Sequence, residues 1–187
     1  IYLQNQIVFE KRKKYLLKAN SGHGKSSILN FIYDCNKNYT GKIIFEGNED
    51  DSIISVRRKK LSYVFQDFKL FPKLTLWENI KIKNNLTNFK TDDHILMIID
   101  KLGLSEKKDQ LVETLSLGQK QRVSIIRSLC QPFDFLLLDE PFSHLDESNI
   151  EILTDIINQE LENQNAGFIM TTLNNEYLFK YDKILNL

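Results

Sequence analysis

A glycine-rich segment at residues 20–27 contains the residue types that bind phosphate groups. Glycines in a tight turn allow consecutive backbone N–H groups to point at one anion, and a lysine adds a positive charge. Residues 19–26 match the pattern Gly-x-x-x-x-Gly-Lys-Ser, except that Ala19 stands at the first glycine. A chance glycine-rich turn before a helix would look similar, so the motif needs a second feature to support it. The residues that we expect around a bound phosphate chain are Asn20, Ser21, Gly22, His23, Gly24, Lys25, Ser26 and Ser27.

An apolar run that ends in two carboxylates provides the second feature. Residues 135–138 are typical of a parallel strand buried on both faces, and Asp139 and Glu140 follow directly. Open α/β sheets bind ligands at the carboxyl ends of their strands. We expect Asp139 to hold Mg²⁺ through water and Glu140 to be the general base for a water that attacks the terminal phosphate. Alone, the two carboxylates could instead cap the next helix. Combined with the lysine motif, they favour a nucleoside triphosphate site.

Alternating strand-like and helix-like segments predict the α/β domain that positions these residues. A strand at residues 15–18 precedes the glycine-rich turn, and a helix at residues 26–34 follows it. Residues 41–47 and 53–56 are apolar segments bounded by Gly, Asn and Asp, and we expect them to form an antiparallel β layer. Further strands are expected at residues 61–65, 135–138, 168–171 and 184–187, and helices at residues 76–82, 92–102, onward to 129, and 149–162.

Charge and composition limit the classes of protein to which this chain can belong. Its 187 residues, of which 42% are hydrophobic, suffice for one packed domain. Lys plus Arg and Asp plus Glu both total 25, so we expect no nucleic-acid partner and interpret the basic runs at residues 11–14 and 57–60 as solvated turns. Only Cys35 and Cys130 are present, which favours a reducing, cytoplasmic setting. No stretch approaches the ~20 apolar residues that cross a bilayer, and the opening residues lack the features of a signal peptide, so we expect no direct membrane insertion.

Residues 115–122, Leu-Ser-Leu-Gly-Gln-Lys-Gln-Arg, place a serine before a basic amphipathic helix. This segment resembles the signature motif of ABC ATPases, with Leu117 at the usual first glycine. The order of motifs is also similar to that family. The phosphate loop, Gln66 after a strand, the signature, the Asp-Glu-Pro segment and residues 143–146 resemble the Walker A, Q-loop, signature, Walker B and D-loop motifs. The resemblance covers nearly the whole chain and implies a P-loop NTPase core with a mostly parallel sheet flanked by helices.

The resemblance also implies roles for individual residues. Lys25 and the loop amides would bind the β- and γ-phosphates of ATP, and Ser26 and Gln66 would lie near Mg²⁺. In this family two copies dimerise head to tail, and the signature of one subunit covers the nucleotide of the other. A second ATP-binding subunit, in a homodimer, is therefore expected as a partner. The residues implied to act across this dimer are Ser116, Gly118, Gln119 and Asp146.

The segment after Gln66 is similar to that of bacterial transporter ATPases, in particular the lipoprotein-release, macrolide-export and cell-division group. There the surface behind the Q-loop receives a short cytoplasmic helix of an integral membrane permease. Phe68 and Phe71 would suit such a contact if exposed, although they could instead fill the junction between core and helical subdomain. The resemblance implies a subunit that binds and hydrolyses ATP and powers a permease through ATP-driven dimer closure. Its expected location is cytoplasmic, peripheral on the cytoplasmic face of the inner membrane.

Leu173 departs from the family pattern, which places a histidine there. Leucine cannot donate a hydrogen bond to the γ-phosphate, a contact worth ~2–4 kcal/mol in a preorganised site, so we expect slow hydrolysis. The alternative function is a hydrolysis-impaired ABC module that acts as an ATP-dependent regulatory or structural switch on a membrane partner. A soluble ABC protein of DNA repair or translation fits less well, because the sequence has no second cassette, long coiled-coil insertion or strongly basic arm.

The family pattern also gives expected boundaries for a single ABC ATPase domain over residues 1–187. Residues 1–70 and 130–187 would form the nucleotide-binding core, and residues 71–129 the helical subdomain with the signature motif. The family's adenine-stacking aromatic lies further upstream of Lys25 than the residues present. We therefore expect the N-terminal strand and the adenine-stacking segment to be missing from this sequence, and we expect no regulatory C-terminal domain.

Overall fold

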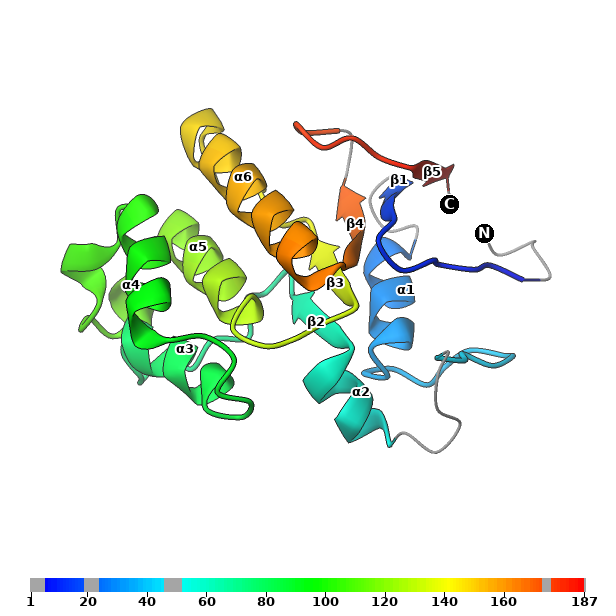
Figure 1. The fold of residues 1–187 in the computed structure, drawn as a ribbon, viewed down its shortest axis with the longest axis horizontal. Coiled ribbons are helices and arrows are strands. Elements are labelled where there is room, and N and C mark those ends of the chain that lie inside the picture. Colours follow the sequence, from blue (N-terminus) through cyan, green and yellow to red (C-terminus); the bar gives the residue numbers. More distant parts are fainter. Residues whose placement is uncertain (1–5, 19–23, 46–51, 173–175, 187) are drawn as a thin grey trace.

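A five-stranded parallel sheet forms the centre of the computed structural model, which describes residues 6–18, 24–45, 52–172 and 176–186 (Figure 1). The strand order is β2-β3-β4-β1-β5, and every pairing between these strands is parallel. The strands are β1 (Lys14–Lys18), β2 (Leu61–Val64), β3 (Phe135–Asp139), β4 (Gly167–Thr172) and β5 (Lys183–Asn186). The α/β class with a mostly parallel sheet is confirmed. The boundaries of each strand lie within one or two residues of those of a predicted strand.

Helices cover both faces of this sheet. Along β3, Leu136 and Leu138 pack into the same core cluster as Leu153 of α6, whereas Leu137 packs with Leu29 of α1 on the opposite face. This alternation follows from the period of two in a strand, and it explains why β3 is apolar throughout. The helices are α1 (Lys25–Ile32), α2 (Ile53–Lys59), α3 (Leu76–Asn84), α4 (Asp92–Lys101), α5 (Leu117–Ser128) and α6 (Glu147–Gln164), with short 3₁₀ turns at Ser105–Lys107 and Val112–Thr114.

The antiparallel β layer predicted from residues 41–47 and 53–56 is wrong for the residues that the structure describes. Residues 42–45 have no strand structure, and Ile53 to Val56 form the start of α2. The Ser52 side chain accepts a hydrogen bond from the Ser55 N–H at 3.3 Å, which caps the helix N-terminus. Three basic residues occupy the last turn, where they stabilise the negative end of the helix dipole. These end effects outweigh the β-branched character of the segment.

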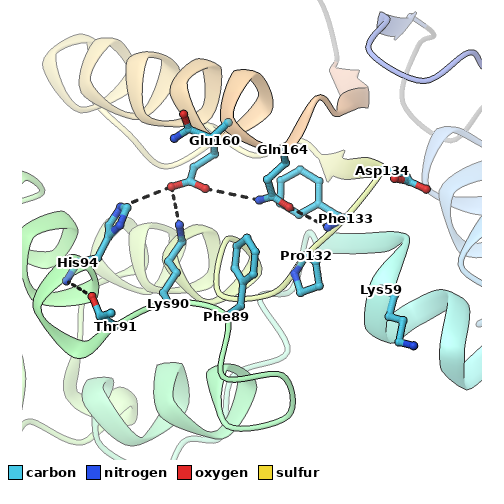
Figure 2. A pocket seen from close by; sticks show the side chains of 11 residues that line it. Lys59, Phe89, Lys90, Thr91, His94, Pro132, Phe133, Asp134, Glu160 and Gln164 are labelled. Atoms are coloured by element: carbon cyan, nitrogen blue, oxygen red, sulfur yellow. Dashed lines mark hydrogen bonds and ion pairs between the residues drawn. The ribbon is translucent and has the colours of Figure 1, made fainter.

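Helices α3, α4 and α5 gather at the end of the molecule away from α1 (Figure 1). A buried ion pair joins this group to α6, because the Lys90 Nζ lies 2.6 Å from the Glu160 Oε1 and both side chains are 5% exposed. The His94 Nε2 lies 3.6 Å from the same carboxylate oxygen, and Gln164 donates a 3.5 Å hydrogen bond to Glu160 (Figure 2). These groups border a cavity of about 470 Å³ between α4, α6 and the segment that leads into β3.

Candidate nucleotide-binding site

Asp139 lies at the carboxyl end of β3, where it is buried and receives three hydroxyl groups. The Ser26 Oγ donates to its Oδ1 at 3.0 Å, the Thr171 Oγ1 donates to the same oxygen at 2.6 Å, and the Tyr63 hydroxyl lies 3.4 Å from Oδ2. Burial, and then the Asp139 charge, raises the pKa of Tyr63, so the phenol stays protonated as a donor. Buried polar groups need such partners.

Tyr63 and Thr171 are contacts of Asp139 that the sequence analysis missed. Both lie near the carboxyl ends of strands that neighbour β3, since Tyr63 pairs with Leu137 and Thr171 pairs with Asp139. A polar residue near the carboxyl end of each strand was the signal that could have identified them. It could be used only once the strand order was known.

Lys25 and Ser26 begin α1 directly after Gly24. Gly24 is the N-cap residue with φ of 82°, a left-handed conformation that favours glycine. Lys25 is buried, and its Nζ lies 4.0 Å from the Glu140 Oε1. The next residue, Ser27, is half-buried on the same helix. Ala19, Asn20, Ser21, Gly22 and His23 lie outside the described residues, as does Leu173.

Glu140 turns the chain sharply after β3. Its φ is 47°, an uncommon value for a residue with a side chain, and its N–H donates to the Thr171 carbonyl oxygen at 3.2 Å. Such backbone outliers persist only when surrounding contacts hold them, and they cluster at functional sites. The hydrogen bond therefore fixes Glu140 relative to β4 at the edge that also carries Asp139.

Gln66 is exposed and follows β2 by two residues. Val64 pairs with Leu138, so the chain leaves β2 at the same edge of the sheet where β3 ends. The structure thus brings Gln66 to the edge that carries Asp139 and Glu140. Phe68, two residues later, is half-buried and contacts the His144 ring, so it packs within this subunit. Phe71 is 51% exposed and is the aromatic that remains accessible to a partner.

The signature residues form a well-capped helix start. Ser116 is exposed and is the N-cap of α5: its Oγ accepts from the Gln119 N–H at 3.3 Å, while the Gln119 Oε1 accepts from the Ser116 N–H at 2.9 Å. This is a capping box. A Cβ at Gly118 would lie 2.8 Å from the His144 carbonyl oxygen, so the close approach of these two segments requires glycine here. Gly118 therefore lies beside His144 and Leu145 of its own chain.

Asp146 caps the next helix, α6, and accepts a 2.9 Å hydrogen bond from the Asn149 N–H. This hydrogen bond and those from the Asn149 and Ser148 side chains hold the pKa of Asp146 below its usual range. Its side chain is exposed and ionised near neutral pH. The predicted site residues that the structure describes thus fall into two groups, one around Asp139 and one at the starts of α5 and α6.

The residues around Asp139 fit a magnesium ion that also binds phosphate oxygens. Across the described ranges, no group of three or more His, Cys, Asp or Glu side chains could hold a metal by itself. Mg²⁺ in nucleotide sites usually takes one or two protein oxygen ligands and completes its shell with phosphates and water. The carboxylate of Asp139 and the hydroxyl of Ser26, already 3.0 Å apart, are ligands of that kind.

No helix in the part of the chain that the structure describes is long and apolar enough to span a lipid bilayer.

Comparison with known proteins agrees with these features. The family model described as ABC transporter matches residues 6–143. The cell division ATP-binding protein FtsE of Bacillus subtilis is 34% identical over 164 residues, which cover 83% of this chain and 71% of FtsE. The lipoprotein-releasing system ATP-binding protein LolD of Buchnera aphidicola is 28% identical over 193 residues, covering 98% of this chain and 84% of LolD.

Solved structures agree as well. The dimeric structure of MJ0796, a bacterial ABC transporter cassette, has a TM-score of 0.76 and 25% identity, covering 88% of this chain and 77% of that one. A post-hydrolysis dimer of the same cassette bound to ADP and Pi has a TM-score of 0.72 over the same shares of the two chains. The predicted family, and the likeness to lipoprotein-release and cell-division ATPases, are confirmed. The chain belongs to the ABC transporter family and is an ATP-binding, ATP-hydrolysing transporter subunit.

Proposed function

We propose that ATP and Mg²⁺ bind at the edge of the sheet that carries Asp139, and that hydrolysis there powers an integral membrane permease. The observation that carries this proposal is the 3.0 Å contact between Ser26 and Asp139, with the Lys25 Nζ only 4.0 Å from Glu140. A hydroxyl, a carboxylate, a cation and a second carboxylate are thereby brought together from two segments that are 113 residues apart. This is the set of groups that phosphoryl transfer needs.

The proposed roles follow from the chemistry of each group. Lys25 neutralises phosphate charge, and Ser26 and Asp139 hold Mg²⁺, with Gln66 nearby. Bound Mg²⁺ would neutralise charge that develops on the phosphate oxygens. Glu140 orients the attacking water and accepts its proton as general base. The remaining proposed nucleotide contacts are Asn20, Ser21, Gly22, His23, Gly24 and Ser27 in the same chain, and Ser116, Gly118, Gln119 and Asp146 across a dimer.

We infer that the working unit is a homodimer. Ser116 is exposed at the N-terminus of α5, where the helix dipole favours an anion such as a γ-phosphate. In the same subunit the Ser116 side chain accepts from the Gln119 N–H, and the Gln119 side chain accepts from the Ser116 N–H. A nucleotide held by a second copy would give Ser116 a ligand. The dimeric cassette MJ0796 supports this arrangement.

The permease is proposed to contact the segment after Gln66. Phe71 is 51% exposed there, and the buried Asn79 side chain accepts from the Phe71 N–H at 2.8 Å and donates to the Thr75 carbonyl oxygen at 2.9 Å. The segment is therefore held in a fixed shape that presents an apolar side chain. LolD belongs to a lipoprotein-releasing system and BceA of Halalkalibacterium halodurans to bacitracin export, and both support a membrane partner for this chain. The protein would then sit peripherally on the cytoplasmic face of a membrane.

The proposed domain division follows the positions of the elements. Residues 71–129 contain α3, α4 and α5 and would form the helical subdomain, and residues 1–70 and 130–187 would form the nucleotide-binding core. We also propose that hydrolysis is slow, because Leu173 cannot donate to the γ-phosphate. Replacement Leu173→His should then raise kcat without changing ATP affinity.

Steady-state ATPase assays and ATP titration of Glu140→Gln test the proposed function. Loss of a general base should lower kcat by about 10²-fold or more, while the Kd for ATP stays within about threefold. Glu162→Gln is the matched control, because it makes the same chemical change on an exposed part of α6 and should leave both values unaltered. Equal turnover in Glu140→Gln and wild type would refute the assignment of Glu140.

A further inference from the structure

Arg127 lies in the last turn of α5 and reaches the segment that follows Gln66. Its Nη1 donates to the Lys69 carbonyl oxygen at 2.7 Å, and its Nη2 donates to the Phe68 carbonyl oxygen at 2.8 Å. The planar guanidinium presents two parallel donors in a fixed fork, so one side chain can hold two successive carbonyl groups. The two contacts join positions about 58 residues apart in the chain.

The two residues that Arg127 holds have unfavourable backbone conformations. Phe68 has φ of 63° and Lys69 has φ of 47°, both in the left-handed region that favours glycine. Each such residue costs on the order of 1 kcal/mol and persists only where other contacts fix it. The hydrogen bonds from Arg127 are contacts of that kind, and they bind the carbonyl groups of the strained residues themselves.

Gln66 lies inside the turn that these residues close. The Phe68 N–H donates to the Phe65 carbonyl oxygen at 3.0 Å, so Gln66 and Asp67 occupy the two central positions of a turn. On its other side Phe68 contacts the His144 ring with centroids 5.8 Å apart. The turn that carries Gln66 is therefore fixed by the C-terminal end of α5 and by the segment before α6.

Arg127 lies in a partly buried region and keeps its positive charge there. Burial lowers the pKa of Arg127 to about 10, which still leaves the guanidinium protonated near neutral pH. Lys83 of α3 is close enough for the Arg127 charge to lower its pKa further, after the larger effect of burial. Two cations are thus kept in a partly buried region, and one of them makes two hydrogen bonds to the strained turn.

We infer that Arg127 is a positioning residue for Gln66. Arg127 holds Phe68 and Lys69 in their left-handed conformations and so couples the turn at residues 65–69 to the signature helix α5. The inference rests on the proposed function of Gln66 near Mg²⁺. It adds that the position of Gln66 depends on the C-terminal end of the same helix whose N-terminus carries Ser116. A shift of α5 would then move both regions together.

The test compares Arg127→Met with Lys83→Met, which also removes a positive charge from this region but keeps both hydrogen bonds to the turn. Hydrogen exchange should be faster at residues 65–71 in Arg127→Met, by about tenfold, with other regions unchanged. The kcat for ATP should fall by about tenfold or more, because small misplacement of a catalytic group is costly, while the Kd for ATP changes less than threefold. Lys83→Met should match wild type in all three measurements.

A second substitution to glycine distinguishes the positioning role of Arg127 from a general effect on folding. In the Arg127→Met background, Lys69→Gly should recover most of the lost kcat, because glycine adopts the left-handed conformation without cost. Lys69→Ala removes the same side chain without that freedom and should not rescue. Equal rescue by both changes, faster exchange across the whole chain, or unchanged exchange at residues 65–71 would overturn the inference. If wild type neither binds nor hydrolyses ATP, the proposed function fails, and exchange at residues 65–71 alone then decides whether Arg127 holds the turn.

Discussion

Among the residues that the structure describes, two buried lysines face carboxylates, and the geometry of the two pairs differs. The Lys90 Nζ lies 2.6 Å from Glu160, and both side chains are 5% exposed. The Lys25 Nζ lies 4.0 Å from Glu140, whose side chain is 16% exposed. The first is a short ion pair that links the segment before α4 to α6, with His94 and Gln164 also at the Glu160 carboxylate. The second is at the outer limit of an ion pair, beside a glycine N-cap and at a strained backbone position.

The comparison teaches that charge and burial alone do not identify a functional lysine. A short buried pair satisfies both partners, and removal of one partner leaves an uncompensated buried charge. A long pair at the carboxyl edge of a parallel sheet allows both groups to contact a third, such as a phosphate chain. The two pairs should therefore respond to mutation in opposite ways.

The largest expected effect is on stability, at Lys90. Lys90→Met leaves the Glu160 carboxylate buried without its cation and should lower the free energy of unfolding by about 3–5 kcal/mol. Denaturant titration measures this change, and ATP affinity of the folded fraction should stay near wild type. Lys81→Met is the control, since Lys81 is 26% exposed and pairs with the 54% exposed Asp92, so its loss should cost less than about 1 kcal/mol. A similar small loss for both variants would contradict the distinction between buried and exposed pairs.

Lys25→Met should show the opposite response. The loss of the cation that faces the phosphates should weaken ATP binding by about 10²-fold, which is roughly 3 kcal/mol. The free energy of unfolding without nucleotide should change less than in Lys90→Met, because the Glu140 carboxylate that loses its cation is 16% exposed, against 5% for Glu160. Calorimetric ATP titration and denaturant titration of the same sample give both values. A variant that binds ATP normally but unfolds easily would show that Lys25, like Lys90, is structural.

The lowered pKa of Lys83 should affect how the free energy of unfolding depends on pH. Burial, with a smaller contribution from Arg127, lowers the pKa of Lys83 to about 8 in the folded protein, against 10.5 for an ordinary lysine. The unfolded chain therefore binds more protons than the folded protein between these two values, so this group makes stability rise with pH across that window. The rise should be about 3 kcal/mol at most, since one pKa unit corresponds to about 1.4 kcal/mol. Lys83→Met should remove it, and an unchanged pH profile in that variant would argue against the lowered pKa.

The smallest expected effect is at Tyr63, the longest of the three hydroxyl contacts to Asp139. Tyr63→Phe removes one donor at 3.4 Å and leaves those of Ser26 and Thr171 in place. We expect a loss of about 1 kcal/mol in stability without nucleotide. Thr171→Val removes a 2.6 Å donor and should cost more. The reverse order in thermal unfolding would count against this ranking of the contacts.

Much of the sheet could be predicted because its signals are local. The apolar run before Asp139 identified β3, and the segments around residues 15–18 and 168–171 identified β1 and β4. Residues 53–56 were misassigned because their β-branched side chains favour a strand, while the Ser52 cap and the basic last turn favour a helix. The prediction relied on strand propensity, whereas in the structure the contacts at the two ends of α2 favour a helix.

The contacts that the sequence could not reveal are those between distant segments. Thr171 and Asp139 are 32 residues apart, and Lys90 and Glu160 are 70 apart, so no spacing rule brings either pair together. The role of the hydrogen bonds from Arg127 to Phe68 and Lys69 could be recognised only from the backbone angles of the turn. Residue type indicated which groups could do chemistry, and only the strand order indicated which of them meet.

Titration calorimetry of the wild-type protein with ATP, in Mg²⁺ and again in excess chelator, tests the central claim most directly. The account predicts saturable binding of one ATP per chain in Mg²⁺, and binding weakened by at least about tenfold when the metal is removed. A folded protein that takes up no nucleotide, or that binds ATP equally well without Mg²⁺, would contradict the placement of the site at Lys25, Ser26 and Asp139.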